Sequence, residues 1–96
     1  MIVLPVIKWN EEKNKWLMRE RGISFQEIAD SILRGKYQDV LENPTRPNQD
    51  LFILRIHGYT WVVPFTIGEN ESICLITAFP SRKFHKRYGG KDEYST

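Results

Sequence analysis

Residues 72–88 read SICLITAFPSRKFHKRY, and this stretch joins a predicted strand to a cationic segment. The first half alternates in hydrophobicity with the period of a strand. One face of this strand is predicted to carry Ile73, Leu75, Thr77 and Phe79. Pro80 then ends the ladder of hydrogen bonds, because proline has no N–H to donate. The stretch therefore predicts a last strand that leads directly into the segment after it.

The second half of the stretch is rich in cations and rings, and no acidic residue follows before Asp92. Its cations are Arg82, Lys83, Lys86 and Arg87, and its rings are Phe84, His85 and Tyr88. Such a segment suits a polyanion, and nucleic acid is the first candidate. The alternative is a solvated C-terminal helix that is capped by Ser81 and docks on the core through Phe84 and Tyr88.

The length and composition predict a single small domain. We expect the domain to comprise residues 1–90 and a short tail to comprise residues 91–96. The net charge is only +2, but five of the fourteen Lys and Arg residues lie within residues 82–91. The single cysteine, Cys74, predicts a small buried side chain in a reducing compartment. The apolar start, MIVLPVI, predicts a short strand rather than a signal peptide or membrane span, so we expect a cytoplasmic protein without a membrane partner.

Two amphipathic helices are predicted before residue 36. Asn10 is a suitable N-cap for the first helix, which is expected to end at Gly22. Its narrow stripe holds Trp9, Lys13, Trp16, Leu17 and Glu20. Ser24 and Glu27 form a capping box for the second helix, which is expected to end at Gly35. Its predicted core face holds Phe25, Ile28, Ala29, Ile32 and Leu33. Because only two residues separate the helices, we expect a tight helical hairpin.

Further strands are predicted after Gly35. Residues 37–41 form a short strand, and residues 42–50 form a turn-rich loop. Residues 51–57 place Phe52, Leu54 and Ile56 on the core face. The opposite face is predicted to hold Leu51, Ile53, Arg55 and His57. Residues 59–66 form the next strand, in which Pro64 predicts a bulge or a lapse in pairing.

The order of these elements predicts the fold class. Both helices come early in the chain, so they must cover one face of the sheet and leave the other partly open. The predicted class is α+β: an N-terminal helical hairpin packed on one face of a small antiparallel β-sheet, followed by a basic C-terminal segment.

The chemistry that the sequence favours is RNA cleavage without a metal. The two histidines and one cysteine have no ligand spacing, and no phosphate-binding loop or hydrolase signature occurs, so we expect no cofactor. RNA brings its own nucleophile, the 2′-hydroxyl, and the protein must only move protons and stabilise the phosphorane. The candidate catalytic residues are Arg55, His57, Arg82 and Tyr88, and the candidate RNA-binding residues are Lys83, His85, Lys86 and Arg87. For each residue the alternative is an ordinary surface or docking side chain.

The order of several motifs resembles the BrnT family of bacterial toxins. The opening, IKWNEEKNKWLMRERGISFQEIADSIL, has a tryptophan followed by asparagine, an acid–lysine pair, a basic helix ending in glycine and a G-[IV]-S-F-x-E entry to the second helix. The matching residues are Trp9, Asn10, Glu12, Lys13, Gly22, Ser24, Phe25 and Glu27. Near the other end, an apolar strand leads into basic residues closed by Arg87 and Tyr88. The resemblance spans about residues 7–88.

The resemblance implies a RelE-like fold and the toxin component of a type II toxin–antitoxin system, a ribonuclease that arrests translation and growth. It also implies an adjacently encoded antitoxin that neutralises the toxin and is usually DNA-binding, so that operator DNA is bound only through the complex. The alternative is a binding module without catalysis, which holds nucleic acid or the antitoxin.

Overall fold

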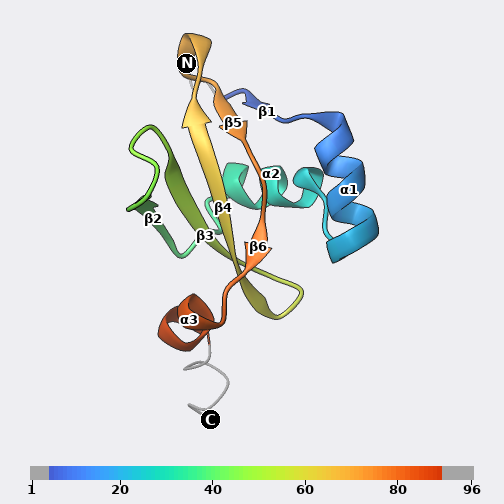
Figure 1. Ribbon diagram of the computed structural model, residues 1–96, viewed down its shortest axis with the longest axis vertical. Coiled ribbons are helices and arrows are strands. Elements are labelled where there is room, and N and C mark those ends of the chain that lie inside the picture. The colour runs from blue at the N-terminus through green and yellow to red at the C-terminus, as the bar shows by residue number, and fades with distance from the viewer. Residues whose placement is uncertain (1–4, 90–96) are drawn as a thin grey trace.

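The computed structural model describes residues 5–89, in which helices cover one face of a six-stranded sheet (Figure 1). In chain order the elements are β1 (Ile7–Lys8), α1 (Glu11–Arg21), α2 (Phe25–Leu33), β2 (Asp39–Glu42), β3 (Asp50–Ile56), β4 (Tyr59–Ile67), η1 (Glu69–Glu71), β5 (Ile73–Leu75), β6 (Phe79–Pro80), α3 (Arg82–Phe84) and η2 (His85–Gly89). The predicted α+β class is confirmed. The predicted tail, residues 91–96, and the first four residues of the chain lie outside the described residues.

The strands run in the order β1-β5-β4-β3-β2, and β6 pairs with β4. The pairs formed by β2, β3, β4, β5 and β6 are antiparallel, as predicted. The β1 strand differs, because it pairs in parallel with β5 and places Ile7 opposite Ile73. The sheet is therefore mixed rather than wholly antiparallel. No short hairpin joins β1 to its neighbour, so the turn geometry that enforces antiparallel pairing does not act on it.

Helix α1 begins and ends where the sequence predicts. The Asn10 side chain accepts a hydrogen bond from the backbone N–H of Lys13 at 2.9 Å, and Gly22 follows the helix with a φ of 69°. A positive φ favours glycine, which has no Cβ to clash. The predicted stripe is only partly correct, because Leu17 is fully buried whereas Trp9 and Trp16 are partly exposed.

Asn14 is a buried polar residue of α1 that the helical pattern did not indicate. Its Oδ1 accepts a hydrogen bond from the backbone N–H of Phe25 at 2.7 Å, and its Nδ2 donates to Gln26 Oε1 at 2.8 Å. Backbone N–H groups in the first turn of a helix have no partner within the helix. Asn14 of α1 therefore provides the hydrogen-bond acceptor for a backbone N–H at the start of α2, and this contact connects the two helices.

Helix α2 has the predicted capping box: Ser24 Oγ accepts from the Glu27 N–H, and the Glu27 side chain accepts from the Ser24 N–H. Its buried residues are Phe25, Ile28, Ala29 and Ile32. Leu33 was predicted to be buried with them, but it is 43% exposed. The core face of α2 is therefore one residue narrower than the pattern predicted.

The main core lies between the two helices and one face of the sheet, and α2 crosses behind β4 and the chain that joins β5 to β6 in Figure 1. Leu17, Phe25 and Ile28 pack there in one cluster with residues of β3 and β4. The predicted core face of β3, which is Phe52, Leu54 and Ile56, belongs to the same cluster. Each fully buried side chain of this size contributes about 1.5–3 kcal/mol relative to exposure.

Pairing between β4 and the next strand is disturbed at Pro64, as predicted, but the extra residue lies in the opposite chain and not in the strand of Pro64. Between the pairs Phe65↔Leu75 and Val62↔Phe79, β4 has two residues and the opposite chain has three. The Pro64 carbonyl accepts from the Ile76 N–H at 2.9 Å, so the missing Pro64 N–H faces the same side. Arg21 of α1 donates a hydrogen bond to the Ala78 carbonyl within the bulge.

The bulge corrects the predicted faces of the last strand. A bulge shifts the alternation by one residue, so Leu75 and Ala78 both belong to the main core cluster. Phe79 pairs with Val62, whose side chain belongs to the cluster on the opposite face. The prediction that Phe79 shares a face with Leu75 was therefore wrong. Pro80 was predicted to end the ladder, but it pairs with Trp61 as the last residue of β6.

Candidate nucleic-acid interface

The sheet face opposite the two helices has a second, smaller apolar cluster. Leu51, Ile53 and Val62 are its buried members, and Phe84 and Tyr88 pack against them. These two rings come from residues 81–89, which we name the C-terminal segment. The segment covers one end of this face, which we name the open face because α1 and α2 do not cover it (Figure 1).

The C-terminal segment folds as a short helix for local reasons. Ser81 Oγ accepts a hydrogen bond from the backbone N–H of Phe84 at 3.2 Å, so Ser81 is the N-cap that the sequence predicted. One turn of α3 continues into the wider turn of η2. The rings of Phe84 and Tyr88, four residues apart, lie on one side with their centroids 6.0 Å apart. The docking interpretation of these two rings is thus confirmed.

Tyr88 fastens the segment to the edge strand β2. Its hydroxyl donates a hydrogen bond to Asp39 Oδ2 at 2.8 Å, and its carbonyl accepts one from Gln38 Nε2 at 3.4 Å. The bond to Asp39 raises the pKa of the Tyr88 phenol, and partial burial raises it further. The phenol therefore stays protonated at neutral pH, which favours a donating role over that of a base.

His85 fastens the segment to β4. Its Nδ1 lies 3.1 Å from the hydroxyl oxygen of Thr60, a fully buried side chain, and its ring stacks on Tyr59 with centroids 4.2 Å apart. These contacts fix the orientation of the imidazole. Nδ1 is engaged by Thr60, so a proton transfer by this ring would have to use Nε2.

The four cations of the segment lie on its outer side. Arg82, Lys83, Lys86 and Arg87 are all exposed, whereas Phe84, His85 and Tyr88 are partly buried. Lys83 Nζ lies 5.5 Å from the Phe84 ring centroid, and the Arg87 guanidinium lies 5.3 Å from that of Tyr88. The rings therefore hold the segment in place, and the cations present positive charge to solvent beside the open face.

Arg55 lies on the open face, as predicted. It is half-buried and pairs across the strands with Thr60, the residue that contacts His85. Cross-strand partners in an antiparallel pair point to the same face. The structure therefore brings Arg55 close to the C-terminal segment.

His57 does not share the face of Arg55, so the predicted placement was wrong. β3 ends at Ile56, and His57 with Gly58 forms the two-residue turn to β4, both with a positive φ. Its Nε2 lies 2.6 Å from Glu27 Oε1 in the first turn of α2. The turn ends the strand alternation on which the prediction depended, and His57 lies on the helix side of the sheet.

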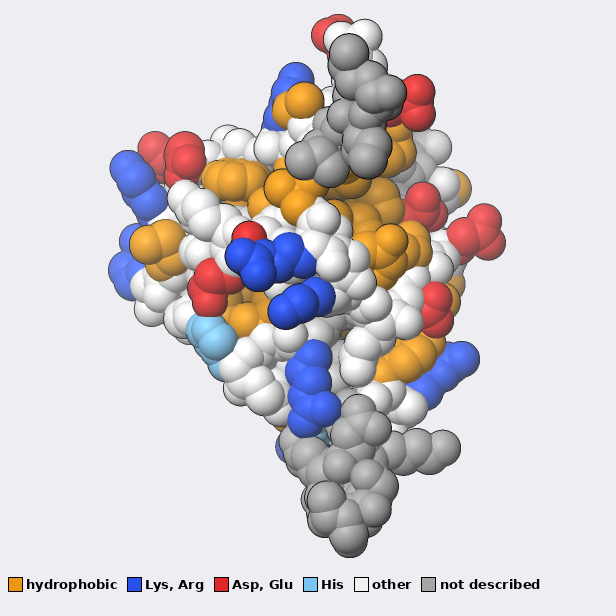
Figure 2. Space-filling view, turned by 180° about the vertical axis from the view of Figure 1, so that it is seen from behind, with side chains coloured by type: hydrophobic (Ala, Val, Ile, Leu, Met, Phe, Trp, Pro, Cys, Tyr) orange, Lys and Arg blue, Asp and Glu red, His pale blue; other side chains and the backbone are white. Residues whose placement is uncertain are grey.

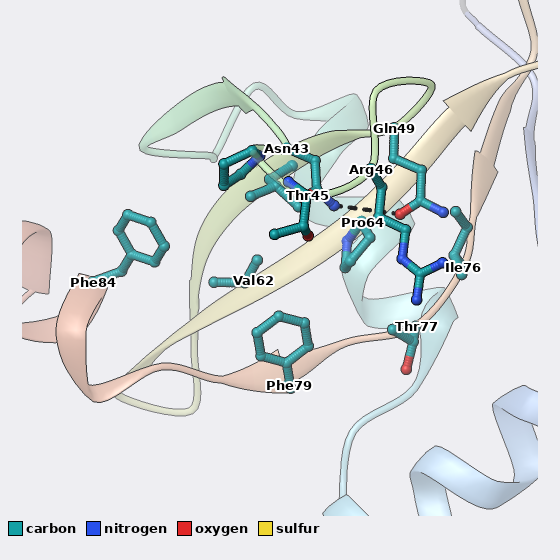
Figure 3. Close-up of a pocket in the computed structure, with 12 residues that line it drawn as sticks. Asn43, Thr45, Arg46, Gln49, Val62, Pro64, Ile76, Thr77, Phe79 and Phe84 are labelled. Carbon is teal, nitrogen blue, oxygen red and sulfur yellow. Dashed lines mark hydrogen bonds between the residues drawn. The ribbon is translucent and has the colours of Figure 1, made fainter.

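The rest of the open face is a groove of about 600 Å³. Its floor includes Leu51, Val62 and Pro64, and the loop between β2 and β3 forms one wall. In Figure 3 the rings of Phe79 and Phe84 lie on either side of Val62, and Arg46 extends from the loop toward Ile76 and Thr77. Neither Phe79 nor Arg46 was predicted to be a site residue. Pro64 indicated disturbed pairing near Phe79, but not that the extra residue lies in the chain that carries Phe79.

The helix-bearing face has a different character. Figure 2 views the molecule from that side, and basic and acidic side chains are interspersed there with hydrophobic ones. Among residues 5–89, no group of three or more His, Cys, Asp and Glu side chains is placed to hold a metal ion. Cys74, predicted to be buried, is half-buried and free. The helices of the described part are too short or too polar to span a membrane.

Comparison with known proteins shows which solved structure this fold is similar to. No family model matches the sequence, and no curated protein matches it. The structure is similar to the crystal structure of the Brucella abortus ribonuclease toxin BrnT, with a TM-score of 0.62 over 80% of this chain and 96% of that chain. The chain has a BrnT-like fold. The sequence identity is 18%, so the likeness concerns the fold, and the resemblance noted in the sequence motifs agrees with it.

Proposed function

We propose that this chain is the toxin of a toxin–antitoxin pair and cleaves RNA on its open face. The observation that supports the proposal most is the BrnT-like fold combined with four exposed cations beside that face. The phosphate backbone supplies most of the affinity of nucleic acid for a basic surface. We assign Lys83, Lys86 and Arg87 to phosphate binding. His85 is assigned to positioning the segment, because its ring is held by Tyr59 and Thr60.

The proposed chemistry uses the RNA 2′-hydroxyl as the nucleophile. As the 2′-oxygen attacks the phosphorus it loses its proton to a solvent water, and the departing 5′-oxygen gains one. Arg55 and Arg82 stabilise the negative charge of the phosphorane, since guanidinium groups bind phosphate oxygens in a forked geometry. The Tyr88 hydroxyl gives up its hydrogen bond to Asp39, forms one to the leaving oxygen and donates its proton to it. His57 has no part in the proposal, because its side chain contacts Glu27 on the other side of the sheet.

The test compares single-turnover cleavage with equilibrium binding. Tyr88→Phe should slow cleavage by roughly 10²–10⁴-fold with binding nearly intact. Arg55→Ala should reduce the rate more than the affinity. Asp39→Asn is the matched control, because the amide oxygen still accepts a hydrogen bond from Tyr88, and cleavage should persist. His57→Asn should leave cleavage unchanged. Cleavage that survives the changes at Tyr88, Arg55 and Arg82 together would place the active site elsewhere.

The proposed partner is an adjacently encoded antitoxin that covers the open face with an acidic or amphipathic segment. The complex should lack nuclease activity, and the free chain should have it. Mapping RNA ends after the chain is induced alone in bacteria tests the cellular activity. If the purified complex cleaves RNA as fast as the free chain, masking of the active site is wrong.

A second candidate is a binding module without catalysis. Two side chains predicted to transfer protons already have partners within the fold, and this favours the alternative. Tyr88 donates a hydrogen bond to Asp39, and His57 contacts Glu27. This alternative predicts that each variant loses affinity for RNA in proportion to the positive charge it removes, and that the unaltered chain does not cleave RNA.

A further inference from the structure

We infer that the groove on the open face holds one unstacked base of single-stranded RNA against Phe79, while Arg46 binds an adjacent phosphate. The inference rests on the proposed RNA-binding role and adds to it the place where a base is held. Residues 79 and 46 lie outside the cationic segment from which that role was argued.

The shape and lining of the groove fit a base. A volume of about 600 Å³ lies within the range of small-ligand pockets, roughly 300–1,000 Å³. Phe79 is 38% exposed, which is unusual for a phenylalanine in a strand, and its ring borders the groove (Figure 3). Proteins recognise single-stranded RNA by stacking splayed bases on aromatic side chains. An exposed ring over an apolar floor provides such a platform.

The polar wall of the groove is held in shape by its own hydrogen bonds. The backbone N–H of Thr45 donates to Asn43 Oδ1 at 3.1 Å, and the backbone N–H of Gln49 donates to the Arg46 carbonyl at 3.0 Å. The Asn43 N–H also donates to the Gln49 carbonyl at 3.2 Å. These bonds order the loop that carries Arg46, so binding costs little loop entropy. Arg46 therefore extends across the groove from a pre-ordered loop.

The bulge opposite Pro64 is the reason that the Phe79 ring lies on the open face. Without the extra residue, Phe79 would share the face of Leu75 and enter the main core. Bulges commonly re-aim a side chain next to a functional site. Arg82 and Lys83 follow Phe79 closely in the chain, so the same stretch of chain carries the ring and these cations. This charge beside the groove favours a nucleotide over an uncharged apolar ligand.

The test uses oligonucleotides that cannot be cleaved. Binding of a 2′-O-methyl hexauridine is compared with binding of an abasic hexamer of the same charge. Phe79→Ala should weaken binding of the hexauridine by roughly 5- to 150-fold, the range for the loss of one stacked base, and leave abasic binding unchanged. Phe79→Trp should retain tight binding, because it keeps a stacking surface. Arg46→Gln should weaken both ligands and reduce the log–log salt slope by about 0.7.

A control variant and a second ligand distinguish a base site from a protein-docking surface. Ile67→Ala changes an exposed side chain on the helix-bearing side and should change neither affinity. Equal losses for the two oligonucleotides, or no loss in Phe79→Ala, would overturn the base site. So would a Phe79→Ala variant that binds RNA normally but binds the antitoxin weakly, because the groove would then be a surface for docking protein. Uncleavable ligands keep the outcome independent of whether the chain is a nuclease.

Discussion

Ile32 and Leu33 are neighbours at the end of α2, yet the structure predicts opposite consequences when each is replaced by alanine. Ile32 is 7% exposed and belongs to the main core cluster, whereas Leu33 is 43% exposed. Truncating a buried isoleucine to alanine costs about 2–5 kcal/mol, from the lost burial and the cavity left behind. Truncating Leu33 removes mostly solvated atoms and should cost less than about 1 kcal/mol. Alanine raises helix propensity more at Ile32 than at Leu33, which works against the expected difference, so a larger loss of stability at Ile32 reports burial.

Thermal and urea unfolding, followed by circular dichroism, measure the two costs. In a domain of this size about 2 kcal/mol lowers the Tm by roughly 8–16 °C, so the Ile32→Ala effect is easily resolved. The Leu33→Ala variant should melt within a few degrees of the unaltered chain, and the urea m-value should be unchanged in both. Equal losses at the two positions would refute this reasoning, because they would mean that Leu33 is core as the helical pattern alone suggests.

Two further predictions concern polar contacts. Asn14→Ala should destabilise the chain by about 1–3 kcal/mol, because it leaves the buried Phe25 N–H without its acceptor. Unfolding experiments measure this loss. The control is Asn10→Ser, an exposed change that retains a capping side chain. The raised folded-state pKa of Tyr88 means that its contribution to stability is present below its ordinary value of 10.0 and is lost as pH rises through the folded value. The difference in unfolding free energy between the unaltered chain and Tyr88→Phe should therefore shrink above about pH 10, and a difference that stays constant to about pH 12 would contradict it.

Local chemistry determined where the helices begin and end, and these features could be predicted from the sequence. Asn10 and Gly22 bound α1, and the Ser24–Glu27 box starts α2, because capping involves only neighbours within three or four residues. A disturbance of pairing at Pro64 was equally predictable, since a missing N–H cannot pair in any register. The cations of the C-terminal segment could also be named from the sequence.

Only the tertiary structure decided which side chains meet. Phe79 was assigned to the wrong face because one bulged residue reverses every later position of a strand, and the place of that residue depends on pairing with β4. His57 was assigned to the open face because the alternation of β3 was carried one residue into the turn, where Glu27 of α2 holds it instead. Arg55 is brought near the C-terminal segment by two contacts: it pairs with Thr60 across the β3–β4 hairpin, and Thr60 contacts His85, which lies 25 residues further along the chain. Composition and periodicity identify the residues of the candidate site, but register across the sheet decides which of them share a face.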